Sequence, residues 1–304
     1  MPVYKAPQRD MQFVLHEMLE VEENYQQFPK YADQFSRDLI NQYLEAAADF
    51  CENEIAPINQ SGDHEGCHFE HGKVTTPKGF KEAYQKYVEL GFTSLTADPV
   101  YGGQGMPTLL RIAISEMLCA SNWSWAMYQG LSHGAMRTLE HHGTEQQKQT
   151  FLTKLIAGIW TGTMCLTESH AGSDLGLIRT KAESQADGSY AITGEKIFIS
   201  AGEHDLAENI VHIVLARLPN APSGTKGISL FIVPKFNVDE SGNIQDRNQV
   251  VCSAIEHKMG IHGNATCVMN FDAAKGYLIG PENRGLNCMF TFMNTARIGT
   301  AVQG

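Results

Sequence analysis

The sequence predicts an α+β protein with a helical N-terminal domain, a middle antiparallel β domain and the truncated start of a C-terminal helical bundle. Apolar residues recur at helical spacing until about residue 160, and short runs rich in β-branched residues then replace them. Helical spacing returns after the stretch "GPENRG". We therefore expect an N-terminal extension over 1–35, a helical domain over 36–160, a β domain over 161–280 and a final helical segment over 281–304.

Capping residues mark the first predicted helices. Ser36 is a good N-cap for a helix that ends before Pro57. Thr76 is the expected cap of the next helix, with Pro77 at its first position and Gly91 just past its end. Proline at helix starts and glycine after helix ends is the usual asymmetry, so we expect a helix between these residues.

Two further helices have threonine at their predicted starts. Thr108 can cap "LLRIAISEMLCA", and Thr144 begins "TEQQKQTFLTKLIAG" with Gln147 three residues later, which is a capping box. A helix within "WSWAMYQGLSHGAMRTLEHHG" is expected between them. We interpret its Trp123 and Trp125 as core residues.

Short strands are predicted for the middle of the chain, separated by turn clusters such as "DGS", "PNAPSG" and "ESGN". No helical period intervenes, so the pattern favours an antiparallel or barrel-like sheet over βαβ units. The helical period that follows continues into Gly304. An amphipathic helix at the end of a chain lacks the partners for its apolar face, so we expect the sequence to be a fragment of a longer protein.

Composition excludes several classes of function. The chain has 304 residues, 42% of them hydrophobic, and a net charge of −11, which argues against nucleic-acid or anionic-membrane binding. No apolar run approaches the ~20 residues of a membrane span, and the start has no secretory signal. The seven cysteines include no CxxC pair, so we expect free thiols and a cytoplasmic protein.

One segment of the first domain offers metal-ligand chemistry. The stretch "DHEGCHFEHG" contains His64, Cys67, His68 and His71. Their spacing fits no standard zinc motif, and tetrahedral sites need converging side chains. We interpret the stretch as a polar connecting loop and predict no metal site.

The stretch "MCLTESHAGSD" (164–174) is the strongest candidate site. An apolar run ends in a Thr-Glu pair and then in small and hydroxyl residues, at a point where a strand should end. Read alone, it is a polar β-turn after a buried strand. The stretch "KIFIS" (196–200) is in the same way an ordinary core strand, and Asn294 with Arg297 is a solvated surface pair on one helix face.

Several motifs in the same order resemble the acyl-CoA dehydrogenase family of flavoproteins over about residues 36 to 304. They are "PVYGGQGMP", "GTEQQKQTFLTKLIAG", "MCLTESHAGSD", "GEKIFISAG", "KMGIHGNATCVMNFD" and "RGLNCMFTFMNTARIGTAVQG". The opening "VYKAPQRDMQFVLHE" looks like the N-terminal extension of a long subgroup that includes 3-methylmercaptopropionyl-CoA dehydrogenase-like enzymes. The resemblance implies FAD as cofactor, acyl-CoA as substrate, electron-transfer flavoprotein as partner and a homo-oligomer.

The resemblance also implies the reaction and the residues that serve it. A carboxylate removes the α-proton of the thioester while the β-hydride moves to the flavin. The family's catalytic Glu lies beyond Gly304, so we expect the 304-residue chain alone to be inactive and to bind FAD poorly. Glu168 is then structural, and Asp174 caps the turn. Ser173 is expected at both flavin and thioester, and Asn294 and Arg297 at the CoA moiety. The residues expected at the cofactor are Met164, Cys165, Leu166, Thr167, Gly172, Ser173, Phe198, Ile199 and Ser200.

The sequence departs from the family pattern at several of these positions. Phe198 and Ser200 stand where the family usually has Trp-x-Thr, so a hydroxyl and an aromatic plane remain but an indole N–H is lost. Two alternatives stay open. One is an acyl-CoA oxidase or flavin monooxygenase of the same fold. The other is a non-catalytic acyl-CoA or partner-binding scaffold, against which the hydroxyls of Thr167, Ser173 and Ser200 argue.

Overall fold

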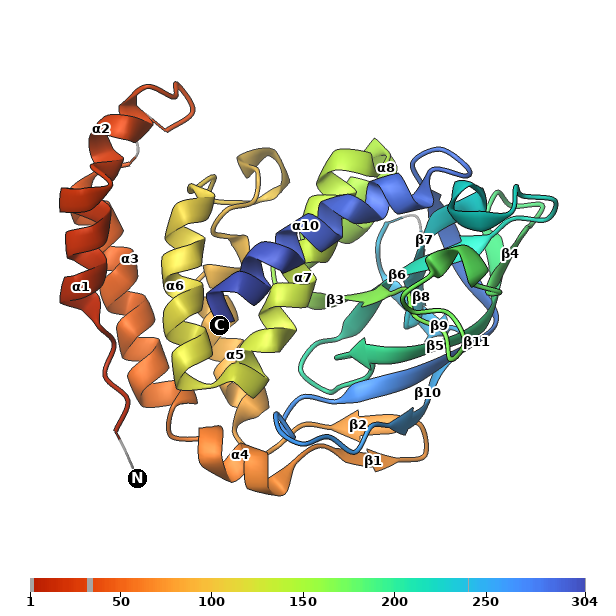
Figure 1. Cartoon of the computed structure of the whole chain (residues 1–304), viewed down its shortest axis with the longest axis horizontal. Helices are drawn as coiled ribbons and strands as arrows, with labels where there is room; N and C mark the ends of the chain where they lie inside the picture. The colour runs from red at the N-terminus through yellow and green to blue at the C-terminus, as the bar shows by residue number, and fades with distance from the viewer. Residues whose placement is uncertain (1–2, 32–34, 240, 304) are drawn as a thin grey trace.

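The computed structural model describes residues 3–31, 35–239 and 241–303. Helices fill one side of the molecule and strands the other, and the last helix lies across both (Figure 1). This arrangement confirms the predicted α+β class. None of the described helices is both long enough and apolar enough to cross a membrane.

The helices of the first part occupy the left and the upper centre of Figure 1. Several run directly into π-helical or 3-10 turns, which are labelled η. They are α1 (Gln8–Gln12), η1 (Phe13–Met18), α2 (Val21–Gln26), α3 (Arg37–Phe50), η2 (Cys51–Ile55), α4 (Asn59–Glu65), α5 (Phe80–Glu89), η3 (Phe92–Ser94), η4 (Pro99–Tyr101), α6 (Thr108–Ser121), α7 (Trp123–His142), α8 (Glu145–Gln147), η5 (Lys148–Leu152) and α9 (Thr153–Ile156).

Local capping explains where three of these helices begin. The Ser36 hydroxyl accepts a hydrogen bond from the Leu39 amide at 3.3 Å, as predicted. The capping box of Thr144 and Gln147 is present in both directions. The cap predicted at Thr76 was wrong: its hydroxyl donates to Asp205 at 2.8 Å, and α5 begins only at Phe80. A partner distant in sequence outcompetes the local backbone for this hydroxyl.

Two other local predictions differ from the structure. Thr108 is the first residue of α6, which begins after Pro107 without a side-chain cap. The polar stretch expected as a loop forms a small hairpin of β1 (His68–Glu70) and β2 (Lys73–Thr75). Its tight turn places His71 and Gly72 at positive φ. The hairpin is largely exposed, so neither hydrophobic alternation nor burial announces it in the sequence.

The strands of the second part form a seven-stranded sheet and a separate β8–β9 hairpin. The order β10-β11-β5-β4-β6-β3 is bent into a ring, because β7 pairs with both β11 and β6. The strands are β3 (Trp160–Cys165), β4 (Lys181–Ser184), β5 (Tyr190–Ser200), β6 (Asn209–Arg217), β7 (Ile228–Pro234), β8 (Phe236–Val238), β9 (Ile244–Arg247), β10 (Val250–Ile255) and β11 (Thr266–Ile279). Short 3-10 turns η6 (Leu175–Leu177) and η7 (Gly224–Gly227) lie in the connections.

The sheet corrects one detail of the prediction, since it is mixed and not purely antiparallel. Strand β3 pairs with β6 in parallel over its whole length, from Trp160 opposite Asn209 to Cys165 opposite Val214. Strand β4 also meets β6 in parallel at one position. The β4–β5 hairpin returns the chain to its starting end before β6 begins, so β6 runs in the direction of β3. Parallel strands are usually joined by a crossover helix, and the sequence between β3 and β6 has no helical period. The sequence therefore did not indicate a parallel pair.

Helix α10 (Gly285–Gln303) joins the two parts. It packs on α6 and α7 and also against β7. Its Phe292 is fully buried and lies on Gly134 of α7, where a methyl group would come within 2.2 Å of the Phe292 ring. The absence of a side chain at Gly134 is therefore what lets α10 approach α7.

We predict that Gly134→Ala lowers stability by about 1–3 kcal/mol, because the added methyl overpacks the contact between α7 and α10. Gly130→Ala on the same helix is the matched control, since its methyl would meet open space. The control should gain roughly 0.5–1 kcal/mol from helix propensity. Urea denaturation of both variants measures the difference, and equal midpoints would show that α10 does not dock through this contact.

Candidate functional site

The predicted site begins where β3 ends. Met164 is partly exposed, while Cys165 is fully buried with its thiol 3.5 Å from the Thr163 hydroxyl. This alternation is that of a strand with two different faces. The following turn runs back on itself through reciprocal backbone hydrogen bonds between Glu168 and Ala171.

A buried ion pair fixes this strand end. Lys196 of β5 is fully buried and donates to a Glu168 carboxylate oxygen at 2.8 Å and to the Leu166 carbonyl at 2.9 Å. Glu168 also accepts from the Arg179 amide and from the amide and hydroxyl of Thr180. Every carboxylate oxygen therefore has a donor, and Glu168 acts as a structural anchor for the turn.

Electrostatics keeps this pair ionised. Burial alone would raise the pKa of Glu168, but the charge of Lys196 and the donated hydrogen bonds outweigh it and lower that pKa below its usual value. Burial lowers the pKa of Lys196 in turn, against the opposing attraction of Glu168. An anion this well bonded is a poor proton acceptor at neutral pH.

A β-bulge forms the second wall of the site. The pairing of β5 with β11 changes register between Lys196, which lies opposite Met269, and Ile199, which lies opposite Cys267. Two residues of β5, Ile197 and Phe198, therefore face a single residue of β11. The bulge turns the Ile197 amide toward the Thr167 carbonyl, to which it donates at 2.9 Å. It also holds Phe198 at a φ of 60°, and this ring is 58% exposed. A large exposed aromatic ring on a strained backbone is a candidate ligand platform.

The turn after Glu168 offers unsatisfied donors. Ser169, Gly172 and Ser173 are exposed, and the amides of Gly172 and Ser173 donate to no protein acceptor among the described residues. A side chain at Gly172 would crowd the Thr167 methyl at 3.2 Å, so glycine lets the turn fold over this strand end. Successive free amides form a concave anion site. Asp174 accepts from the Gly176 amide at 2.8 Å and caps η6, as expected.

The structure divides the nine residues expected at a cofactor into three groups. Thr167, Gly172, Ser173, Phe198 and Ser200 are at least partly exposed at one end of the sheet. Cys165 and Ile199 point into the barrel core, so only their backbone is available to a ligand. Leu166 packs in the other core and Met164 reaches a cavity.

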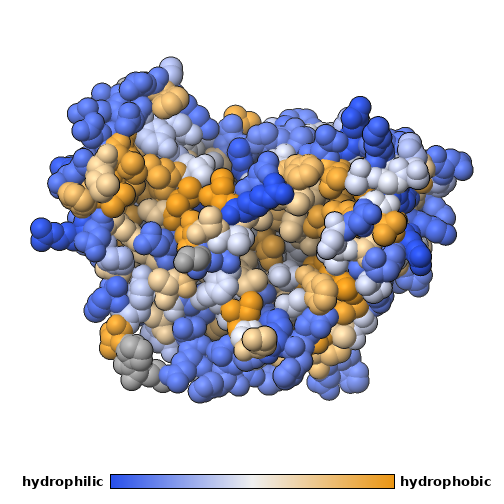
Figure 2. Space-filling view, in the orientation of Figure 1, coloured by the Kyte–Doolittle hydropathy of each residue, from blue (hydrophilic) through white to orange (hydrophobic). Residues whose placement is uncertain are grey.

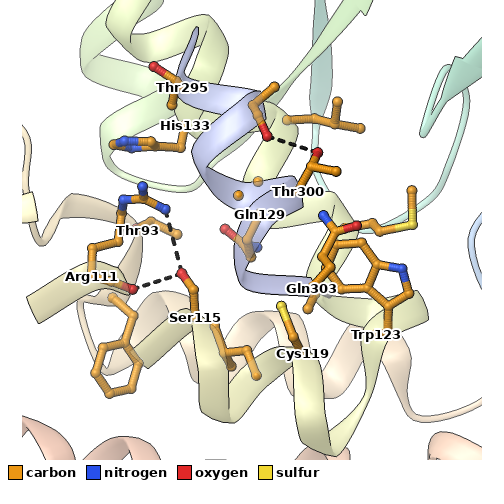
Figure 3. A pocket seen from close by; sticks show the side chains of 18 of the residues that line it. Thr93, Arg111, Ser115, Cys119, Trp123, Gln129, His133, Thr295, Thr300 and Gln303 are labelled. Atoms are coloured by element: carbon orange, nitrogen blue, oxygen red, sulfur yellow. Dashed lines mark hydrogen bonds between the residues drawn. The ribbon is translucent and has the colours of Figure 1, made fainter. Parts of the chain in front are cut away.

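The cavity has a volume of about 300 Å³ and lies between α6, α7 and α10 (Figure 3). Met164 is the residue that β3 contributes to its wall. The wall is mainly apolar, with residues such as Phe92, Leu118, Met127 and Met136. On the outer face in Figure 2, apolar side chains form separate patches within a largely hydrophilic surface. A mainly apolar cavity of this size suits a small-molecule ligand.

Sequence analysis missed the polar residues of this cavity. Arg111 and Cys119 of α6, Gln129 and His133 of α7 and Thr295 of α10 all line it. Trp123, interpreted as a core residue, is also part of the wall, whereas Trp125 is fully buried as predicted. One signal was available: Arg111 interrupts the otherwise apolar run "LLRIAISEMLCA".

Asn294 and Arg297 lie outside the cavity. Both are exposed on α10, and the Arg297 guanidinium donates to the Asn294 side chain at 2.9 Å and stacks over Phe290. Their predicted contact with CoA stays a prediction. The histidines of the β1–β2 region are likewise at the surface, with His68 beside Glu65 and His71 beside Glu70.

Comparison with known families matches both parts of the chain. Residues 38–159 match the acyl-CoA dehydrogenase N-terminal domain, and residues 163–274 match the acyl-CoA dehydrogenase middle domain. A 3-methylmercaptopropionyl-CoA dehydrogenase of Ruegeria pomeroyi is 44% identical over 99% of this chain. The chain spans 51% of the length of that relative.

Solved structures share the fold. Butyryl-CoA dehydrogenase from Megasphaera elsdenii superposes with a TM-score of 0.73 at 28% identity, over 89% of this chain and 66% of that one. An acyl-CoA dehydrogenase complexed with FAD from Bacillus anthracis gives 0.70 at 25% identity, over 89% of this chain and 42% of that one.

We predict that Lys196→Met destabilises the protein by about 3–5 kcal/mol, because it leaves Glu168 buried without its counter-charge. Lys275→Met is the control, since the Lys275–Asp187 pair is exposed and such pairs contribute about 0–1 kcal/mol. Adding Glu168→Gln to Lys196→Met should recover part of the loss. Denaturant midpoints measure all three, and a loss at Lys196 no larger than at Lys275 would contradict the anchoring role.

Proposed function

Because this chain belongs to the acyl-CoA dehydrogenase family, we propose that it supplies the flavin-facing sheet and the acyl cavity of an FAD-dependent acyl-CoA dehydrogenase. The observation that carries the proposal is the position of Met164. Its side chain lines the apolar cavity, and its strand ends one residue later, at Cys165, directly before the polar turn. An acyl chain in the cavity would thus have its thioester end beside the cofactor wall.

The residues of the two walls suit FAD. Phe198 offers an exposed aromatic face to a flat ring, and the hydroxyls of Thr167 and Ser200 offer hydrogen bonds to ring heteroatoms. The free amides of Gly172 and Ser173 suit a pyrophosphate. When bound, FAD supplies an acceptor for the hydride that leaves the β-carbon. The chain's own contribution is to hold ring, phosphates and acyl chain and to keep water out.

The proton acceptor is the part that these residues do not offer. No Asp or Glu lines the cavity within the described part of the chain, and Glu168 is fully engaged. From the family resemblance, we propose that the catalytic Glu lies beyond Gly304. We also propose that the released electrons pass to an electron-transfer flavoprotein, that the protein assembles as a homo-oligomer and that it is cytoplasmic. These three proposals rest on the resemblance and the composition.

The reaction has a direct test. The FAD-loaded full-length protein, which the resemblance implies to carry the catalytic Glu, should lose its flavin absorbance band when a saturated acyl-CoA is added without oxygen, and an enoyl-CoA should form in equal amount. Oxygen consumption with the same substrate would indicate the oxidase alternative instead. A flavin spectrum unchanged by every acyl-CoA would favour the non-catalytic scaffold.

We predict that Thr167→Ala combined with Ser200→Ala weakens FAD binding to the full-length protein about tenfold, because each hydroxyl contributes roughly 0.5–1.5 kcal/mol as a neutral hydrogen bond. Ser253→Ala on β10 is the control, since this exposed hydroxyl bonds only the neighbouring strand. Quenching of flavin fluorescence gives the dissociation constants. Retention of wild-type affinity in the double variant would remove both hydroxyls from the cofactor site.

A further inference from the structure

Arg111 places a positive charge at an apolar cavity. It projects from the middle of α6, and its Nε is buried without a hydrogen-bond partner among the described residues. Among the described residues, its one side-chain hydrogen bond is a long one of 3.5 Å to the Ser115 hydroxyl of the same helix (Figure 3). A guanidinium stays ionised in proteins, so burial cannot neutralise it.

No carboxylate of the described chain balances this charge. None of the cavity-lining residues is Asp or Glu, and no acidic oxygen lies within ion-pair distance of Arg111. The neighbouring Arg137, in contrast, is paired with Glu140. Burial lowers the pKa of Arg111 below its usual value, which reflects the cost of the unbalanced charge. Such a charge is costly to bury unless a counter-ion joins it.

Neutral polar groups accompany Arg111. Figure 3 shows the imidazole of His133 next to the guanidinium, and Gln129 also reaches the cavity. Burial and the charges of Arg111 and Arg137 hold the pKa of His133 well below its usual value, so the ring is neutral at neutral pH. The Gln129 amide nitrogen is a second buried donor without an acceptor. These groups supply donors and one positive charge, and no negative charge.

The position of Arg111 separates it from the cofactor wall. Arg111 enters from α6, which packs against α3, α7, η2 and α10, whereas Met164 enters from the sheet. A thioester that reacts beside Met164 would direct its acyl chain among the helices. The part of the ligand that meets Arg111 is then the far end of the acyl chain.

On the basis of the proposed function, we propose that the acyl cavity selects acyl-CoA thioesters with a carboxylate at the distal end of the acyl chain, and that Arg111 is the residue that recognises this carboxylate. A guanidinium binds a carboxylate through two parallel hydrogen bonds. The neutral side chains of His133 and Gln129 would donate further hydrogen bonds to the same carboxylate. A methyl-terminated chain would instead leave the partly buried charge of Arg111 unpaired.

The experiment compares matched acyl-CoA pairs on the FAD-loaded protein. Succinyl-, adipoyl- and suberoyl-CoA are titrated against butyryl-, hexanoyl- and octanoyl-CoA. Binding is followed by the flavin spectrum and, independently, by the fluorescence of Trp123 in the cavity wall. We expect at least one dicarboxylyl thioester to bind about tenfold or more tightly than its methyl-terminated match, the effect of a hydrogen bond between charged groups.

Variants assign the effect to Arg111. Arg111→Met should abolish the preference for the dicarboxylyl thioester without weakening its methyl-terminated match, and Arg111→Gln should do so while keeping a polar side chain. Arg137→Met is the control, an arginine of the neighbouring helix that is already paired and should preserve the preference. Urea midpoints establish that the variants are folded.

Two outcomes overturn the inference in distinguishable ways. If both classes of thioester bind equally well to the wild type, the carboxylate site is contradicted and the proposed function is not. The same holds if Arg111→Met changes the affinity for both classes by the same factor. If no thioester of either class binds, both the proposed function and the proposed selectivity for dicarboxylyl thioesters are contradicted.

Discussion

The geometry of the candidate site depends on the buried ion pair of Lys196 and Glu168. Lys196 ties the last residues of β3 to β5, two strands that are not neighbours in the sheet. Glu168 then ties the following turn to Thr180, at the start of β4. Burying two charges is costly, and the cost is tolerable here because each carboxylate oxygen and the ammonium have several partners. The same contacts position the Thr167 carbonyl for the bulge of β5.

The bulge and the helices extend this constraint to the whole site. Because the Ile197 amide bonds Thr167 and not a partner in β11, Phe198 is forced outward on the same sheet end as the free amides of the turn. On the opposite side of β3, Met164 faces α7 and the cavity. A single strand therefore contributes to a polar wall and to an apolar pocket, and its parallel pairing with β6 fixes its position.

Sequence reasoning succeeded where the determining contacts are local. The Ser36 cap, the Thr144 capping box, the change from helix to strand near Trp160 and the role of Asp174 all depend on residues within a few positions. It failed where a distant partner decides, as for Thr76, whose hydroxyl bonds Asp205. The parallel pairing of β3 with β6 and the convergence of Arg111, His133 and Thr295 on one cavity are likewise tertiary facts. The proposed flavin wall rests on the family resemblance, whereas Arg111 belongs to no motif that would mark it as a site residue.

Two kinds of buried polar group in this protein point to two different uses. Glu168 and Lys196 are fully satisfied within the chain, as is Glu203, which pairs with Lys235 and Arg247. Such groups fix one conformation and leave nothing for a ligand. Arg111 and Gln129 retain donors without acceptors within the described residues, and they do so on the wall of a cavity. Since a buried donor without an acceptor is destabilising, its retention beside an open volume is best explained by an acceptor that arrives with the ligand. The satisfied ion pairs thus fix the conformation of the site, and the unsatisfied donors on the cavity wall can discriminate between ligands.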